Sequence, residues 1–411
     1  MKKKLVLVTA HFPYGSSETF LESELPILAK NFEQIEILTF RVKGEKRNIP
    51  ANCTVTDISI KESNFIAYLG IFSVLFWKEI FTIKLIYRKK ISLGILKTML
   101  ISLMRAKNIA SFINLKIQNK QDHIYYSYWC DDSALALAIL NKENNKLLKT
   151  VTRSHGWDVY FEVSDYNYLP FRHFIHEQLS QIFPISEKGK KYMEEIWKVK
   201  GKITVSRLGT SSPPLEGDQG GGHLFNSIKK SDVFTIVSCS NLIPLKRVPL
   251  IIEALSLIEN KSIHWIHFGD GPEEQFLKEL AHKKLKHNIT YNFKGRIANI
   301  EVLEFYKINT PQVFINVSSS EGIPVSIMEA MSFGIPCIGT DVGGNGEIIV
   351  DSSNGILLQS NPNIIDVKDA ILEITSKTPE QYIEISKNAF QTWKNLYNSE
   401  TNYTNFTKLI R

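Results

Sequence analysis

The sequence predicts a doubly wound α/β protein of two domains, and three observations lead to this fold class. Short apolar runs rich in β-branched residues alternate with helical patterns along most of the chain, as in parallel sheets built from βαβ units. One tract, residues 209–223, interrupts the alternation with Pro-Pro and Gly-Gly-Gly, a composition typical of linkers. With 411 residues, 43% of them hydrophobic, the chain is long enough for two cores of roughly 200 residues each.

The predicted strands fall into two groups, one on each side of this tract. The first group comprises residues 4–10, 35–40, 123–128, 148–154, 181–186 and 202–207, and the second comprises 233–240, 263–269, 289–295, 312–317 and 335–341. The last 30 residues have a helical and aromatic pattern. We therefore expect an N-terminal domain at 1–210, a linker at 211–228, a C-terminal domain at 229–385, and a terminal helix at 386–411 that crosses back to the first domain.

The cysteines and the first residues indicate the compartment. The four cysteines, Cys53, Cys130, Cys239 and Cys337, are far apart and form no C-x-x-C pair, which argues against a zinc site or a disulfide framework. The first 15 residues are basic but contain only a short apolar run, which predicts a buried strand better than a signal peptide. We expect the protein in the cytoplasm.

The positive charge is concentrated in one segment. Residues 61–120 contain eleven Lys or Arg against two Glu, a net of +9, whereas the whole chain carries +7. Residues 65–77 form an uncharged run of 13, shorter than the roughly 20 residues that span a bilayer. Apolar runs with interleaved cations suit helices on an anionic lipid surface, so we expect a peripheral position on the cytoplasmic face of the membrane. The alternative is core helices with a solvated basic face.

The stretch from Ser318 to Gly344 has the features of a ligand site. It predicts a strand, a loop, and then a helix with Pro324 in its first turn and Gly334 at its end. Gly322 lets a ligand approach the backbone, and the free N–H groups at the helix start suit a phosphate. Glu329 lies one turn in, on a largely apolar helix, where ribose or sugar hydroxyls would supply hydrogen-bond donors. The alternative is a capping Glu321 and a Glu329 at an exposed rim.

This stretch, with its pattern E-G-x-P-x-x-x-x-E-A-M-x-x-G-x-P followed by "GTDVGGNGEII" and "NGILL", closely resembles the retaining glycosyltransferases of family 4 (group 1). The resemblance implies the GT-B fold, in which two Rossmann-like domains face each other across a cleft. It also implies that Glu321 contacts donor sugar hydroxyls and that Glu329 binds the ribose. The implied diphosphate site is the backbone of Gly322, Ile323, Pro324, Val325 and Ser326.

Other loops of the C-terminal domain agree with the resemblance to different degrees. "SNLIPLKRV" is similar to the family's phosphate loop and keeps its lysine as Lys246, but Asn241 stands where an arginine is expected. Arg247 is then the second cation available to the leaving diphosphate. The alternative for Lys246 is a solvated lysine at a helix start. "GDGPEEQF" resembles the family's G-x-G-P turn at Gly271, and "FKGR" resembles the segment near the nucleobase at Gly295.

The N-terminal domain is the less similar half. "PYGSSETFLESEL" resembles the family's loop that closes on the donor phosphates, with Gly15 allowing close approach and Glu18 and Thr19 facing the acceptor. "RSHGWD" places His155 at a strand end, beside the transferred sugar in related enzymes, with Asp158 as a weaker acceptor candidate. The alternative for His155 is a structural hydrogen-bonding role.

Two further observations concern the N-terminal half and the metal. The stretch from Tyr125 to Asp132, which ends in "YSYWCDD", fits either the lining of an acceptor cleft or core aromatic residues. The sequence contains no D-x-D, the usual carboxylate clamp for a divalent cation on a diphosphate. We therefore expect no metal and no cofactor, with positive charge and helix dipoles in the metal's place.

The predicted activity is transfer of a sugar from a nucleotide diphosphate sugar to an acceptor hydroxyl. The implied catalytic residues are His155, Glu321 and Lys246. The expected acceptor is a lipid-linked or cell-surface polysaccharide precursor, and no nucleic acid is expected as a partner. Two alternatives keep the same fold: a nucleotide-sugar epimerase or hydrolase, and a sugar-nucleotide binding protein without activity.

Overall fold

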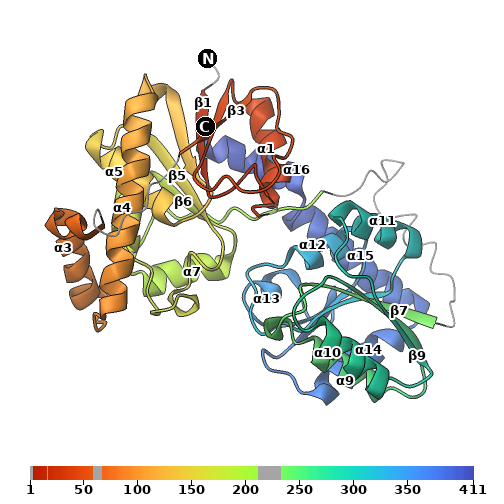
Figure 1. Ribbon diagram of the computed structural model, residues 1–411. Coiled ribbons are helices and arrows are strands. Elements are labelled where there is room, and N and C mark those ends of the chain that lie inside the picture. The colour runs from red at the N-terminus through yellow and green to blue at the C-terminus, as the bar shows by residue number, and fades with distance from the viewer. Residues whose placement is uncertain (1–2, 16, 59–66, 212–232) are drawn as a thin grey trace. The chain divides into compact units, whose positions relative to one another are not determined.

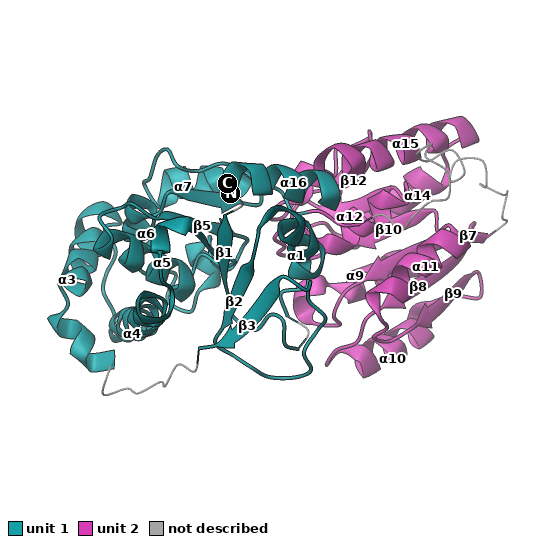
Figure 2. Cartoon of the chain, turned by 90° about the horizontal axis from the view of Figure 1, so that it is seen from above, with its two compact units in different colours: residues 1–208, 399–411 teal, residues 209–398 magenta. Residues whose placement is uncertain are grey.

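The computed structural model describes residues 3–15, 17–58, 67–211 and 233–411, and these residues form two compact units (Figures 1 and 2). Unit 1 comprises Met1–Leu208 together with Ser399–Arg411, and unit 2 comprises Gly209–Asn398. The chain therefore passes between the units twice. From residue 212 on, the predicted linker lies outside the described residues.

Unit 1 is built on a six-stranded sheet in the order β3-β2-β1-β4-β5-β6, in which every neighbouring pair is parallel. The strands are β1 Lys4–Thr9, β2 Ile35–Thr39, β3 Cys53–Asp57, β4 His123–Ser127, β5 Lys149–Ser154 and β6 Gln181–Pro184. The helices are α1 Phe20–Asn31, α3 Val74–Phe81, α4 Leu93–Lys116, α5 Asp132–Glu143, α6 Arg172–Gln178, α7 Glu187–Ile196 and α16 Ser399–Ile410.

Both faces of the unit 1 sheet are buried, because side chains alternate along each strand. In β1, Leu5 and Leu7 belong to the core under α1 and α16, whereas Val6 and Val8 belong to the core under α4 and α5. The predicted strand at 202–207 is wrong. It runs beside β6 as an irregular segment, with an isolated bridge between Ile182 and Ile203 and a backbone hydrogen bond from the N–H of Ser206 to the carbonyl oxygen of Pro184 at 2.9 Å.

Unit 2 repeats this architecture with the sheet order β12-β11-β10-β7-β8-β9, again parallel throughout. Its strands are β7 Val233–Cys239, β8 Ser262–Phe268, β9 Ile289–Phe293, β10 Val313–Asn316, β11 Cys337–Thr340 and β12 Gly355–Leu358. Its helices are α9 Val248–Ser256, α10 Glu274–Lys284, α11 Asn299–Asn309, α12 Val325–Ser332, α13 Asn345–Ile348, α14 Ile364–Thr375 and α15 Pro379–Leu396. The predicted fold class of two doubly wound domains is confirmed.

The C-terminal helix α16 is part of unit 1 although it follows unit 2 in the chain. Phe406 and Ile410 are fully buried in the core that contains Leu5 and Leu7. Beneath α16, the guanidinium of Arg153 stacks on the Phe406 ring at 3.9 Å and pairs with Glu24 of α1, 3.2 Å from Nε. This buried pair holds α1, β5 and α16 together.

Candidate active site

The loops after the strands of unit 2 lie at one edge of its sheet, because the carboxyl ends of parallel strands point the same way. An ion pair joins two of these loops. Lys246, in the short turn η5 (Pro244–Lys246), donates from Nζ to Oε1 of Glu321 at 2.6 Å, and Asn316 donates from Nδ2 to the same oxygen at 3.2 Å. Only 19% of the Lys246 side chain and 9% of the Glu321 side chain are exposed, so solvent screens this pair less than a surface pair.

The N-terminus of α12 lies immediately after Glu321. Pro324 is the N-cap residue of this helix, so it lies just before the first turn in which the sequence predicts it. The N–H groups of Val325 and Ser326 are in the first turn, where no intrahelical acceptor is available. A Cβ added to Gly322 would have no heavy atom within 4 Å. The backbone before α12 therefore borders open space, as an anion-binding site requires.

A glycine turn on the next loop supports this backbone. Gly343 has a φ of +53°, and a Cβ there would lie 1.7 Å from the carbonyl oxygen of Glu321. The N–H of Gly344 donates to the carbonyl oxygen of Gly322 at 2.5 Å. The two glycines of "DVGG" thus allow the turn after β11 to pack closely against residues 321–322.

Glu329 lies inside the fold, and the alternative of an exposed rim position is wrong. Only 7% of the residue is exposed, and Asn299 of α11 donates from Nδ2 to its Oε1 at 2.7 Å. Burial raises the pKa of Glu329 to about 7, which the bond from Asn299 opposes. Such a carboxyl group is only partly ionised at neutral pH, and further hydrogen-bond donors would stabilise its charged form.

Arg247 has a different role from the one expected. Its backbone is in the left-handed region, with a φ of +49°. Its guanidinium donates to the carbonyl oxygens of Val317 (2.6 Å), Ser318 (2.7 Å) and Ser360 (3.1 Å), and to Oδ1 of Asn361 (3.1 Å). These hydrogen bonds from the guanidinium join the loop after β10 to the segment after β12. Lys246 is therefore the cation of this loop that pairs with a site carboxylate.

The remaining predicted donor-site residues lie on the same edge. Asn241 is exposed on the loop after β7. At Gly271 a Cβ would lie 2.4 Å from the carbonyl oxygen of Leu242, so that glycine is explained by packing between two loops. Gly295 has a φ of +67°, and its carbonyl oxygen accepts from the N–H of Gly269 at 2.9 Å. Direct contact of these three residues with a donor stays a prediction.

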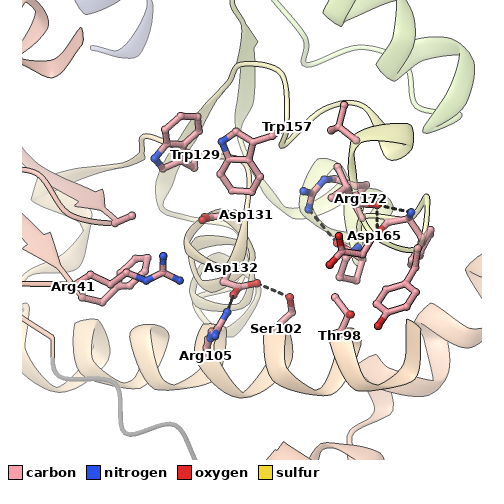
Figure 3. A pocket seen from close by; sticks show the side chains of 18 of the residues that line it. Arg41, Thr98, Ser102, Arg105, Trp129, Asp131, Asp132, Trp157, Asp165 and Arg172 are labelled. Atoms are coloured by element: carbon pink, nitrogen blue, oxygen red, sulfur yellow. Dashed lines mark hydrogen bonds and ion pairs between the residues drawn. The ribbon is translucent and has the colours of Figure 1, made fainter. Parts of the chain in front are cut away.

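Unit 1 has a cavity of about 610 Å³ at the carboxyl edge of its own sheet (Figure 3), a size typical of small-molecule sites. Loops after β1, β2, β4 and β5 and one face of α4 surround it. Its charged and aromatic lining includes Arg41, Arg105, Arg172, Asp131, Asp132, Asp165, Trp129 and Trp157.

The floor of the cavity combines acids with hydrogen-bond donors. Asp132 accepts from Ser102 Oγ at 2.5 Å and from Arg105 Nη1 at 3.4 Å, both on α4. Asp131 caps α5 by accepting from the N–H of Ser133 at 2.9 Å. Burial, and then the neighbouring Asp132, raise the pKa of Asp131 to about 7. Groups of this kind bind sugar hydroxyls, which both donate and accept hydrogen bonds.

Two indole rings form one wall of the cavity. The rings of Trp129 and Trp157 lie 5.1 Å apart at an interplanar angle of 46°, and 49% of Trp157 is exposed. Figure 3 shows both rings above Asp131. Exposed aromatic faces of this type provide apolar contact area beside polar groups. Both expectations for "YSYWCDD" hold in part, because Tyr125, Tyr126 and Tyr128 are core residues and Trp129, Asp131 and Asp132 line the cavity.

Glu18 borders this cavity, but its carboxylate is already used. It accepts from the N–H groups of Ala10 (2.9 Å), His11 (2.8 Å) and Phe12 (2.6 Å) and from Nε1 of Trp129 (2.7 Å). This carboxylate fixes the loop after β1, and its contact with an acceptor stays a prediction. Thr19 is exposed at the start of α1. Gly15, with a φ of +64°, lies where a Cβ would be 2.9 Å from the carbonyl oxygen of Lys43.

His155 and Asp158 form a buried group behind the indole wall. Asp158 is fully buried and accepts from the N–H groups of Cys130 (2.9 Å) and His155 (2.7 Å), so it supports the loops rather than facing an acceptor. Burial opposes its charge, but the His155 ring and these N–H groups outweigh burial and lower its pKa. The His155 ring is 9% exposed and packs on Trp129 at 4.4 Å between ring centroids. Its Nδ1 lies 3.7 Å from Oδ2 of Asp158, and neither ring nitrogen has a partner at hydrogen-bond distance among the described residues. Its catalytic role stays a prediction.

Among the described residues, no helix combines the length and the apolar character that a membrane span requires. Within the same residues, no three His, Cys, Asp or Glu side chains gather in an arrangement that would hold a metal ion.

Comparison with known proteins shows first the fold class and then a family to which part of the chain is similar. The chain aligns over 99% of its length, and over 99% of the other chain, with an Anabaena protein solved in complex with UDP and glucose, at a TM-score of 0.63 and 16% identity. This likeness and the two parallel sheets define a GT-B fold. Residues 223–392 match the family model of glycosyl transferases group 1. This part of the chain, which contains every site residue described in unit 2, is therefore similar in sequence to that family.

Two relatives show how far the sequence similarity extends. An uncharacterized glycosyltransferase of Haemophilus influenzae is 26% identical over 209 residues, 50% of this chain and 54% of that protein. An O-antigen biosynthesis glycosyltransferase of Escherichia coli is 26% identical over 250 residues, 58% of this chain and 64% of that protein. The chain thus matches between about half and two thirds of the length of these two relatives.

Proposed function

We propose that this protein is a retaining glycosyltransferase of family 4, which moves a sugar from a nucleotide diphosphate sugar to an acceptor hydroxyl. The observation that carries the proposal is the Lys246–Glu321 ion pair beside the N-terminus of α12, with Glu329 buried one turn further on. A cation and free N–H groups suit a diphosphate. The two carboxylates suit the hydroxyls on either side of that diphosphate.

The proposed donor complex uses each of these groups once. The diphosphate lies against the N–H groups of Val325 and Ser326, and Lys246 neutralises part of its charge. Glu321 accepts hydrogen bonds from the sugar that is transferred. Glu329, bonded on one side by Asn299, accepts from the ribose hydroxyls. The Anabaena structural neighbour was solved in complex with UDP and glucose, which favours trying UDP sugars first.

The proposed reaction proceeds on one face of the sugar, so the anomeric configuration is retained. The bond between C1 and the diphosphate oxygen breaks, and the diphosphate keeps the electron pair. The acceptor oxygen then bonds to C1 on the same face, and its proton passes to the departing phosphate. Lys246 and the α12 dipole stabilise the charge that develops on the diphosphate, so we propose that no metal ion is needed for this step.

The cavity of unit 1 is the proposed acceptor site. Its indole wall and its acids on α5 suit a glycan, because indole faces contact sugar C–H groups and carboxylates accept from hydroxyls. The E. coli relative, whose name describes O-antigen biosynthesis, supports a lipid-linked or cell-surface polysaccharide precursor. We propose a cytoplasmic location, peripheral to the membrane, since the four cysteines are free thiols.

The test is release of nucleoside diphosphate from UDP-, GDP-, ADP- and dTDP-sugars, with a glycan acceptor panel, in EDTA and in Mg²⁺. We expect acceptor-dependent release from one nucleotide class, equal in both buffers, and a product whose anomeric configuration by NMR matches that of the donor. Release without acceptor would instead indicate a hydrolase, and an inverted product would contradict the retaining mechanism. Tight nucleotide binding without turnover on any acceptor would indicate a binding protein.

A further inference from the structure

One corner of unit 1 exposes an unusual density of large apolar side chains. Of the 27 such side chains exposed among the described residues, ten lie between Tyr68 and Leu93. We call this region the α3 surface. It comprises Tyr68, Leu69, Ile71, Phe72, Val74, Trp77, Phe81, Leu85, Ile86 and Leu93. Exposed apolar side chains are ordinary when scattered, but a cluster marks a site of interaction.

The α3 surface belongs to a firmly packed element. The turn η1 (Leu69–Phe72), α3 and the π-turn η2 (Thr82–Ile86) follow one another and lie against α4 (Figure 1). Phe76 and Ile83 point into the unit 1 core. Glu79 is buried, where its carboxylate accepts from the hydroxyl of Tyr168 and from the N–H of Phe171. The exposed side chains are therefore the outer face of an anchored helix. Its inner side is core, as the alternative of core helices with a solvated basic face requires, but its outer side exposes large apolar side chains as well as cations.

The exposed charges that residues 67–116 contribute to this apolar face all have one sign. Lys78, Lys84, Arg88, Lys90 and Lys97 are exposed among or beside its side chains. Glu79 is the one acid between residues 67 and 116, and it is buried. Asp165 is exposed on a neighbouring loop, whose Asn167 accepts from Lys89, so the cations are in clear excess. The α3 surface thus combines protruding Phe and Leu side chains, the interface-preferring rings of Trp77 and Tyr68, and an excess of exposed cations. Anionic lipid headgroups over an apolar layer are complementary to this combination.

The same charges argue against a second copy of the chain as the partner. In a symmetric dimer the same patch meets itself, so the excess of exposed cations on one copy would face the same excess on the other. Like charges across an interface are unfavourable.

We propose that the α3 surface docks the protein on an anionic lipid surface, with Phe72, Leu85 and Leu93 inserted among the headgroups. These three side chains are 85%, 72% and 86% exposed. Docking does not depend on the proposed reaction. It would, however, bring α4 to the membrane, and Thr98, Ser102 and Arg105 of α4 line the cavity of unit 1.

The test is cosedimentation of the full chain with vesicles, without nucleotide or acceptor. We expect binding to phosphatidylcholine vesicles that contain 30% phosphatidylglycerol (roughly one anionic lipid in three, enough for a surface potential), and much weaker binding to phosphatidylcholine alone or in high salt. The variant F72S/L85S/L93S should lose at least about tenfold in binding, since each change removes an inserted side chain. The matched control L115S/L147S changes two equally exposed leucines of unit 1, 84% and 65% exposed, and should bind normally.

A second pair of variants tests the charges. K84Q/K90Q should bind anionic vesicles less well, whereas K107Q/K116Q, at the other end of α4, should bind as the unchanged protein does. Equal loss in the test and control variants, or no binding of the unchanged protein, would overturn the proposal. Self-association that F72S/L85S/L93S abolishes, seen by analytical ultracentrifugation without vesicle binding, would assign the α3 surface to a second copy instead. Loss of vesicle binding with normal transfer to a soluble acceptor separates this proposal from the proposed function.

Discussion

The two sheets of this protein present charged groups at the same kind of edge, but they arrange them differently. In unit 2 each site carboxylate has a near neighbour that fixes it, Lys246 for Glu321 and Asn299 for Glu329. In unit 1 the acids and arginines line a cavity of about 610 Å³ beside exposed indole rings. The difference indicates that unit 2 is built for one ligand chemistry, whereas unit 1 offers a broad surface whose selectivity depends on shape and stacking.

The largest effect is expected from Lys246→Ala. The substitution removes the cation that stabilises the departing diphosphate, and it leaves Glu321 partly buried with no counter-charge. Transfer should therefore slow about 10²–10³-fold. Initial rates at saturating donor measure this. Lys278→Ala, which removes a surface ion pair of the same unit with Glu274, is the matched control. Near-normal turnover in Lys246→Ala would remove the reason for assigning the donor site to unit 2.

Substitutions at two glycines of unit 2 should differ in their effects on stability and on nucleotide binding. Gly343→Ala places a Cβ 1.7 Å from the Glu321 carbonyl oxygen, so it should lower the free energy of unfolding by about 2–3 kcal/mol. Gly322→Ala meets open space, so its Tm should stay nearly unchanged while nucleotide affinity falls about tenfold. Thermal unfolding and titration calorimetry measure the two effects. Normal nucleotide affinity in Gly322→Ala would place the diphosphate elsewhere.

Glu329 should make stability depend on pH. Its pKa is raised to about 7 in the folded protein, so the folded state binds more protons than the unfolded state between pH 4.5 and 7, and stability falls as pH rises through this window. Glu329→Gln lacks the buried charge and should be more stable than the unchanged protein at pH 8, by about 3 kcal/mol. The advantage should disappear near pH 4. Denaturant unfolding at both pH values measures it, and a pH-independent difference would contradict the buried-charge explanation.

The smallest effect is expected in unit 1. Trp157→Ala removes half of the indole wall and should raise KM for the acceptor about tenfold, in line with the 0.5–1.5 kcal/mol of an aromatic contact. Nucleotide affinity should not change, because the proposed donor site lies in unit 2. Trp157→Phe, which keeps an aromatic face, is the control. A fall in nucleotide affinity would show that the two units do not divide the substrates as proposed.

Local sequence patterns predicted much of unit 2. The strand, loop and helix around Glu321 follow from residues within one short stretch, and the fold class followed from alternation that repeats along the chain. Asn299 was not predicted, because its bond to Glu329 joins α11 to α12 and leaves no pattern between neighbours in sequence. Arg247 was assigned to the diphosphate by its charge alone. Its left-handed backbone and the carbonyl groups around it, which decide its role, are properties of the folded loop.

The unit 1 cavity was largely hidden from the sequence for the same reason. Its lining comes from separate loops and from one face of α4, and no single segment contains enough of it to form a motif. Glu18 was expected to face the acceptor, and it borders the cavity, but the four donors around its carboxylate come from the loop after β1 and from Trp129. Only the fold reveals that this charge is already satisfied.

The membership of α16 in unit 1 makes unit 2 an insertion within the first unit. The two connections between the units run side by side. Leu208 and Asn402, both in unit 1, are joined by a 2.8 Å hydrogen bond, and Thr210 and Tyr397, both in unit 2, are joined by one of 2.9 Å. A premature stop codon in the last 13 positions would therefore damage the half of the protein that was synthesised first, by uncovering the core around Leu5 and Leu7. On the ribosome, unit 1 cannot complete its fold until unit 2 has been made.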